Sequence, residues 1–372
     1  MKPAATDLRR RSDDVVDLHR QLVEIRSVSG EEAEIAGFAL QWLAARGARV
    51  ERLGNSVLAH RGDPSSEPLL LNSHLDTVPA SGDWTCDPFQ ATTTEGRVRG
   101  LGSNDAKASV AALMVAFVSS ASRADLPGLL LTLVEGEETK GEGTRAVFGE
   151  LQRRGVEPRA AVFGEPTGLD VAVAQKGLVI LELHAHGTAC HVAHAERLSA
   201  KNALSVLAHD LVALESVDLG GEHPFLGRTT MSPTQASGGV AHNVIPALAT
   251  AVLDLRTTPE FTPDELADRV RSRVASDVVL RSSRLLPTAI DPTHPLVAAA
   301  RQARPEAKLF GSPTLSDMAR MPAFFPGVPA IKVGPGRTER SHTPDEYVTV
   351  EELAAGAAFY SRLIDVWHKE AW

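Results

Sequence analysis

The chain has 372 residues, 43% of them hydrophobic, so it is long enough to bury a large core and to divide into two domains. Its 38 basic and 47 acidic residues give a net charge of -9, which argues against a nucleic-acid partner because such partners require clustered lysine and arginine. The two cysteines, Cys86 and Cys190, are too distant to suggest a disulfide framework, and a polar N-terminus without an apolar run of ~18 residues predicts a cytoplasmic protein with no membrane partner.

The first half of the chain alternates helical and strand patterns. Apolar residues spaced three and four apart predict a helix from Val15 to Ile25, and Ser29 with Glu32 predicts a capping box that opens a second helix ending at Gly47. Further patterns predict strands at 69–71, 129–134 and 160–164, and helices at 108–121 and 144–153. This alternation favours a mostly parallel α/β sheet that is covered on both faces.

The pattern changes after Lys176. Strand-like runs at 178–186, 229–236, 249–256 and 278–281, with helical patterns at 200–214 and from 262, follow the order β-α-β-β-α-β of a ferredoxin-like α+β domain. The α/β pattern resumes with a strand at 330–333 and a last helix capped by Thr349 and Glu352. We therefore predict a discontinuous catalytic domain, residues 1–176 and 287–372, interrupted by a smaller inserted domain, residues 177–286.

Two segments near the middle of the catalytic domain place polar side chains where a sheet edge is expected. His74 and Asp76 end the strand that starts at residue 69, and because they are two residues apart they can share one side. Asp105 lies in a glycine-permitted turn just before an apolar helix. Taken alone, His74 and Asp76 are better explained as a polar strand end in a turn, and Asp105 can be explained as a helix cap.

Three further segments repeat this arrangement. Glu137 and Glu138 follow the strand at 129–134, Glu165 follows the strand at 160–164, and His342 follows a glycine-rich turn. Adjacent carboxylates at a strand end point to opposite sides, so one can bind a metal while the other faces a substrate, although an exposed acidic loop explains them too. Together with His74 and Asp105 they form a ligand set suited to zinc, cobalt or manganese.

These motifs resemble the dinuclear zinc deacylases and exopeptidases, a family that includes acetylornithine deacetylase, succinyl-diaminopimelate desuccinylase, aminoacylases and glutamate carboxypeptidases. The resemblance covers nearly the whole chain and implies two Zn²⁺ ions, for which Co²⁺ or Mn²⁺ can substitute. It further implies one metal bound by His74 and Glu165, a second bound by Glu138 and His342, and a bridge formed by Asp105.

The resemblance also assigns roles to residues that bind no metal. Asp76 would orient His74, and Glu137 would act as the general acid/base. Residues 187–191 match the family's Gly-x-x-x-His, whose histidine crosses a dimer interface, so His191 would help to stabilise the oxyanion in a homodimer, with His194 as a competitor. Asn243 and Arg256 are candidates for binding the substrate α-carboxylate, although a surface salt bridge explains Arg256 equally well.

Three stretches, 72–79 with 100–105, 311–317 and 334–342, look most similar to the acetylornithine deacetylase branch. This similarity implies hydrolysis of N-acetyl-L-ornithine to L-ornithine and acetate in arginine biosynthesis, and Asp317 or Glu339 is predicted to meet the ornithine ammonium group. The alternatives are a desuccinylase acting on N-succinyl-ornithine or N-succinyl-diaminopimelate, a metallo-dipeptidase or carboxypeptidase, and a non-catalytic metal- or peptide-binding scaffold.

Overall fold

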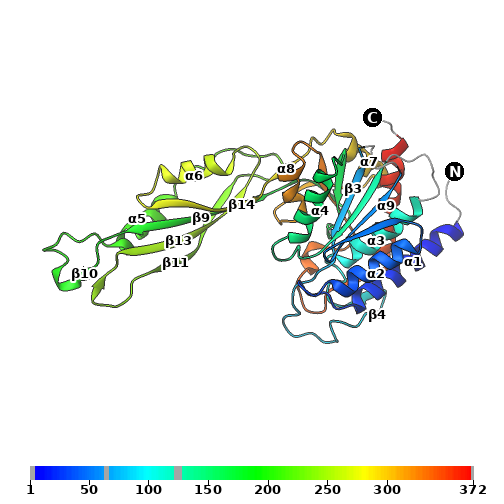
Figure 1. The fold of residues 1–372 in the computed structure, drawn as a ribbon, viewed down its shortest axis with the longest axis horizontal. Coiled ribbons are helices and arrows are strands. Elements are labelled where there is room, and N and C mark those ends of the chain that lie inside the picture. Colours follow the sequence, from blue (N-terminus) through cyan, green and yellow to red (C-terminus); the bar gives the residue numbers. More distant parts are fainter. Residues whose placement is uncertain (1–4, 63–66, 121–127, 370–372) are drawn as a thin grey trace. The chain divides into compact units, whose positions relative to one another are not determined.

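The computed structural model describes residues 5–62, 67–120 and 128–369, with side chains from residue 14 onward (Figure 1). The chain forms two compact units. Unit 1 comprises Met1–Val173, Ala289–Phe310 and Ser316–Trp372, and unit 2 comprises Ala174–Thr288 and Gly311–Leu315. Each unit has a hydrophobic core of its own.

Unit 1 is built on a mixed, mostly parallel sheet. Strand β3 is parallel to β6 and β7, and β17 is parallel to β7. Every residue of β3, β6 and β7 is buried, which confirms the predicted coverage of both faces. The strand order is β1-β2-β6-β3-β7-β17-β8-β15, with β16 paired to β8. The bounds are β1 Arg49–Leu53, β2 Ser56–Arg61, β3 Leu69–His74, β6 Leu129–Val134, β7 Ala160–Phe163, β8 Val171–Gln175, β15 Thr288–Ala289, β16 Leu309–Ser312 and β17 Ala330–Lys332.

Helices pack on this sheet in two groups. Helix α3 contacts β3 and β6 and packs against α1 and α9, while α7 packs against α9 and β17. Helix α4 contacts β1, β2 and β6, and its Phe148 lies in a core cluster with Leu70, Phe163 and Met318. The bounds are α1 Ala5–Glu24, α2 Ala33–Ala44, α3 Lys107–Ser119, α4 Glu142–Arg153, α7 Pro295–Ala303, η3 Asp317–Arg320, α8 Met321–Phe324, η4 Thr338–Arg340 and α9 Val350–Lys369. No helix in the described part of the chain combines the length and apolarity that a membrane crossing requires.

The two capping boxes predicted in unit 1 have different outcomes. Thr349 and Glu352 form theirs at the start of α9, with Glu352 N donating to Thr349 Oγ1 at 3.1 Å and Thr349 N to Glu352 Oε2 at 2.9 Å. The box predicted for Ser29 and Glu32 is wrong, because α2 has no side-chain cap. Ser29 donates instead to Asp76, 2.7 Å away, and Glu32 accepts from the backbone N–H of Gly30 and of Gly136.

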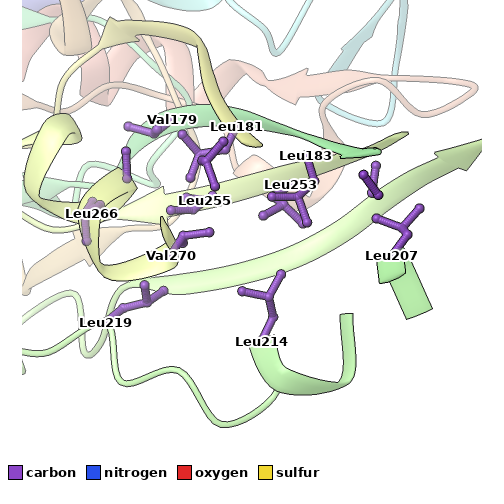
Figure 2. Packing of buried hydrophobic residues seen from close by; sticks show 14 of the residues in the cluster. Val179, Leu181, Leu183, Leu207, Leu214, Leu219, Leu253, Leu255, Leu266 and Val270 are labelled. Atoms are coloured by element: carbon purple, nitrogen blue, oxygen red, sulfur yellow. The ribbon is translucent and has the colours of Figure 1, made fainter. Parts of the chain in front are cut away.

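Unit 2 has the predicted β-α-β-β-α-β order, and its four strands pair antiparallel in the order β11-β13-β9-β14. Leucines from β9, β13, α5 and α6 meet on one face of the sheet (Figure 2), where each buried leucine stabilises the fold by roughly 1.5–3 kcal/mol. The bounds are β9 Gly177–His186, α5 Ala203–Leu214, β11 Thr230–Gly238, β13 Leu248–Thr257, α6 Pro263–Arg271 and β14 Asp277–Leu285. A small ladder that the sequence did not suggest joins β10, Cys190–His191, to β12, Val244–Ile245, and η2, Val192–His194, follows β10.

A three-stranded sheet of short strands completes unit 1, in the order β18-β5-β4. Its strands are β4 Thr92–Thr94, β5 Arg97–Arg99 and β18 Tyr347–Thr349. Because β5 precedes the Asp105 turn and β18 follows His342, the pairing of Tyr347 with Arg99 brings two distant parts of the chain side by side.

Candidate metal and catalytic site

The candidate residues of unit 1 collect at the carboxyl edge of its sheet. Strand β3 runs parallel to β6 and β7 in a register that pairs Leu69 with both Leu129 and Ala160. Since parallel strands end at the same edge, His74, the pair Glu137 and Glu138, and Glu165 emerge together. The sequence predicts the individual strands, but only their parallel pairing brings these residues together.

Two histidines and two carboxylates lie close together at this edge. His74 Nε2 is 3.3 Å from Asp105 Oδ1, while His342 Nε2 is 2.8 Å from Glu138 Oε1 and 3.7 Å from Asp105 Oδ2. The ligand atoms of His74, Asp105 and Glu138 all fall within 4.8 Å of one another. Asp105 therefore directs one oxygen toward each histidine, and it is not the helix cap that its position in the sequence also allowed.

Two more carboxylates face this group. Burial raises the pKa of Glu165 to about 8, and it raises the pKa of Glu137 well above the usual range, with the charges of Asp317, Glu165 and Glu138 acting in the same direction. Burial opposes protonation of His74, but hydrogen bonds to Asp105 and Asp76 outweigh it and raise the pKa of this imidazole. Without a cation the cluster thus holds protons that isolated carboxylates would release.

The donor set fits divalent metals. Zinc binds imidazole nitrogen and carboxylate oxygen at about 2.0–2.2 Å, so ligand atoms around one ion lie roughly 3–3.5 Å apart. His74 Nε2 and Asp105 Oδ1, 3.3 Å apart, match this spacing, while His342 Nε2 and Glu138 Oε1, 2.8 Å apart, would have to separate slightly. The hydrogen bond that His342 donates to Glu138 raises the pKa of this imidazole to about 9, so in this state it carries a proton where a metal ligand needs a lone pair. A bound cation would take the place of that proton and relieve the crowding of negative charge.

Asp76 holds several of the candidate residues in position. It is fully buried, and its Oδ1 lies 3.4 Å from His74 Nδ1. Burial raises the pKa of Asp76, but the hydrogen bond and charge of His74, together with the hydrogen bonds from Ser29 and the backbone of Glu138, outweigh it and lower this pKa. The same carboxylate accepts from the backbone N–H of Glu137 at 3.0 Å and of Glu138 at 3.1 Å. One side chain therefore fixes both an imidazole and the turn that carries two carboxylates.

The candidates in unit 2 have ordinary surroundings. His191 is exposed, caps η2 by accepting from Ala193 N at 3.1 Å, and lies 5.9 Å from His194 between ring centroids. Asn243 is its neighbour, because Val192 N donates to Asn243 O at 2.9 Å. Arg256 is held by Asp254, with Nε 2.8 Å from Oδ1, which is the salt bridge considered as the alternative to carboxylate binding.

The two residues predicted to meet an ornithine ammonium group differ in their accessibility. Asp317 is 3% exposed and pairs with Arg320, whose Nε is 3.2 Å away, so this carboxylate already has a cation. Glu339 is exposed and lines a pocket of about 220 Å³ together with Thr167, Asp170, Phe310, Arg337 and Thr338. The geometry therefore argues against Asp317 and leaves Glu339 as a prediction.

Sequence reasoning missed two residues that shape the site. Ser29 donates to Asp76, and Glu346 accepts from the backbone of the turn that presents Asp105. In the sequence, Ser29 has the pattern of a helix cap, and Glu346 is a charged residue just before a strand. Neither pattern reveals a partner that lies 47 or 241 residues away.

Comparison with known protein families places this geometry in context. The family model described as Peptidase family M20/M25/M40 matches residues 70–366. The chain belongs to this peptidase family. Among M20-type relatives, the succinyl-diaminopimelate desuccinylase of Acidiphilium cryptum is 30% identical over 381 residues, which cover 95% of this chain and 98% of that enzyme. A peptidase M20 domain-containing protein of Schizosaccharomyces pombe is 28% identical over 95% of this chain and 84% of its own length.

Solved structures show the same M20 architecture. Aminopeptidase PepT from Bacillus cereus aligns with a TM-score of 0.78 and 18% identity, covering 96% of this chain and 98% of that one. A dinuclear metal-binding peptidase of the M20 family from Bacillus subtilis aligns with a TM-score of 0.74 and 17% identity, covering 97% and 99%. At such identities the likeness establishes the fold, so the predicted fold class is confirmed.

Membership of the M20 family makes this chain a hydrolase of the metallopeptidase, carboxypeptidase and desuccinylase type. The predicted resemblance is thus confirmed at the level of the family. The closer likeness to acetylornithine deacetylase stays a prediction.

Proposed function

We propose that the protein hydrolyses, with the help of two zinc ions, the amide bond of an N-α-acyl amino acid. The observation that carries this proposal is the partly buried Glu137 beside the cluster of His74, Asp105, Glu138 and His342. A carboxylate that has a raised pKa, lies next to a candidate metal site and is not one of its proposed ligands is suited to move a proton during hydrolysis.

The proposed metal ligands divide into two groups. His74 and Glu165 would hold one ion, Glu138 and His342 the other, and Asp105 would bridge them, because its two oxygens face the two histidines. When bound, such ions supply Lewis acidity that polarises a carbonyl and makes water more acidic. Co²⁺ or Mn²⁺ would suit the same nitrogen and oxygen donors.

Glu137 and Asp76 would serve the reaction in different ways. Glu137 would accept a proton from the attacking water and return it to the departing amine nitrogen, a task favoured by its raised pKa. Asp76 would keep His74 oriented and hold the backbone of Glu137 in place. Glu137 would therefore be needed for turnover, and Asp76 for positioning His74 and Glu137.

Unit 2 would act as a lid and as the homodimer interface. In the part of the chain that the structure describes, the exposed large apolar side chains all fall in this unit: Val192, Leu198, Leu204, Val212, Val240, Leu248 and Val279. Its edge strand β11 is also exposed along most of its length, and an open edge can pair with another chain. In such a dimer His191 would supply an oxyanion donor, and Asn243 with Arg256 would bind the substrate α-carboxylate.

Two substrates are the leading candidates. N-acetyl-L-ornithine is the prediction from sequence resemblance and would place the enzyme in cytoplasmic arginine biosynthesis. N-succinyl-diaminopimelate is the second, favoured by the 30% identity to a desuccinylase over nearly the full length of both chains. Dipeptides and C-terminal peptide bonds are further candidates, since the probable carboxypeptidase of Aspergillus terreus is 34% identical over 71% of this chain.

The test is amine release from N-acetyl-L-ornithine, N-succinyl-ornithine, N-succinyl-diaminopimelate and a dipeptide panel, with added zinc and with a chelator. We expect turnover of one acyl amino acid that the chelator abolishes and zinc restores. Preference for a dipeptide would contradict the deacylase proposal, and activity that survives metal removal would contradict the metal-dependent reaction itself.

A further inference from the structure

The turn that carries Asp105 is buried, so its backbone N–H groups require acceptors within the protein. Three of them donate to a single carboxylate, that of Glu346. Gly102 N lies 3.0 Å from Oε2, while Asn104 N and Asp105 N each lie 2.8 Å from Oε1. The side chain of Glu346 is itself buried, with 2% of the residue exposed, so water does not compete for these bonds.

The backbone of Glu346 reinforces this contact. Its carbonyl oxygen accepts from Gly100 N and from Ser103 Oγ, each at 3.1 Å. The next residue, Tyr347, begins the ladder with β5. Glu346 follows His342, a proposed ligand of one metal, by four residues. It therefore links the segment that carries His342 to the turn that carries Asp105, the proposed bridging ligand.

We propose that Glu346 is a positioning residue that fixes Asp105 at the spacing which both metal ions require. This inference rests on the proposed two-metal function. Asp105 faces His74 with one oxygen and His342 with the other, so a displacement of its turn would disturb both metal sites at once. In contrast, removal of a ligand that binds a single metal, such as His342, would disturb only one of the two metal sites.

Glu346→Gln tests this role, because it preserves the shape and replaces one acceptor oxygen with an N–H donor that must face a backbone N–H. Metal-free protein would be titrated with zinc against a competing chelator dye. We expect the affinity for both ions to fall by about 10–100-fold, the usual effect of losing a partner that orients a metal ligand. Glu351→Gln, which removes an exposed carboxylate at the start of α9, is the matched control and should titrate like the unaltered protein.

Two further readouts separate positioning from a general loss of structure. In the Co²⁺-loaded protein the visible absorption spectrum of Glu346→Gln should change, and at saturating metal kcat should fall while KM stays the same. Glu346→Asp, which keeps the charge but draws the carboxylate back by one methylene, should show the same loss of affinity.

The outcomes are distinct. A Glu346→Gln protein that binds both zinc ions like the unaltered chain would overturn the positioning role while leaving the proposed function intact. If Glu346→Gln and Glu346→Asp both failed to fold, the residue would serve the fold alone, and the inference would again be wrong. Failure of the unaltered protein to bind zinc would instead refute the proposed function.

Discussion

The candidate residues of the two units have opposite environments. In unit 1, His74, Asp105 and Glu138 converge within 4.8 Å, and burial shifts the pKa of Glu137 and Glu165 upward. In unit 2, His191 is exposed and Arg256 is neutralised by a neighbour on its own strand. The contrast shows that the candidate residues of unit 1 form a cluster suited to a cation, whereas those of unit 2 would act, under the proposed function, when a substrate or a second chain meets them.

The strongest test of this contrast removes the proposed proton carrier of unit 1. Glu137→Gln should lower kcat by about 10²–10⁴-fold, the usual contribution of a general acid/base, with both zinc ions retained. Steady-state kinetics and metal analysis measure the two effects. Glu142→Gln, which removes an exposed carboxylate at the start of α4, serves as the control, and near-full activity of Glu137→Gln would show that the proton follows another path.

A comparable test applies to unit 2. His191→Ala should lower turnover by about 10²–10³-fold if the imidazole supplies an oxyanion donor, and it should leave the zinc content unchanged. Mixing His191→Ala with Glu137→Gln subunits should restore part of the activity if the site is shared between two chains. Absence of recovery in a mixture shown to form heterodimers would assign His191 to its own subunit or to no catalytic role.

The pH dependence of metal uptake would show whether unit 1 binds cations at the expense of protons. In the metal-free protein the raised pKa values, about 9 for His342 and about 8 for Glu165, mean that both groups are protonated at pH 7. Zinc must displace these protons, so its affinity should rise with pH up to about 9, by about tenfold per pH unit for each proton released.

Calorimetric titration in buffers of different ionisation enthalpy counts the released protons. His342→Ala should reduce that count. Uptake of zinc without proton release would show that the cluster is ionised before the metal arrives.

The smallest effect is expected for Arg256 in unit 2. Arg256→Lys keeps the charge but loses the paired N–H groups that can grip a carboxylate, so KM should rise by about tenfold with little change in kcat. Asp254→Asn releases Arg256 from its present partner and provides the comparison. If Arg256→Lys changes neither parameter, the guanidinium is only half of a surface salt bridge.

The sequence by itself determined the secondary-structure order and the identities of the candidate ligands. Apolar runs gave β3, β6 and β7, and each run ends beside a histidine or a carboxylate because polar side chains belong at the open edge of a buried strand. The Thr349–Glu352 capping box was also predictable, since its partners are three residues apart.

Only the tertiary structure decided which of these residues touch and what holds them in place. Ser29 does not form its predicted helix cap because its hydroxyl donates instead to Asp76, a buried charged acceptor that is distant in sequence. Glu346 contacts the turn of Asp105 because the β18–β5 ladder brings residues 102–105 close to its carboxylate. A local pattern predicts a local hydrogen bond only where no buried partner competes for it, whereas a buried carboxylate takes its partners from whichever backbone the fold places beside it.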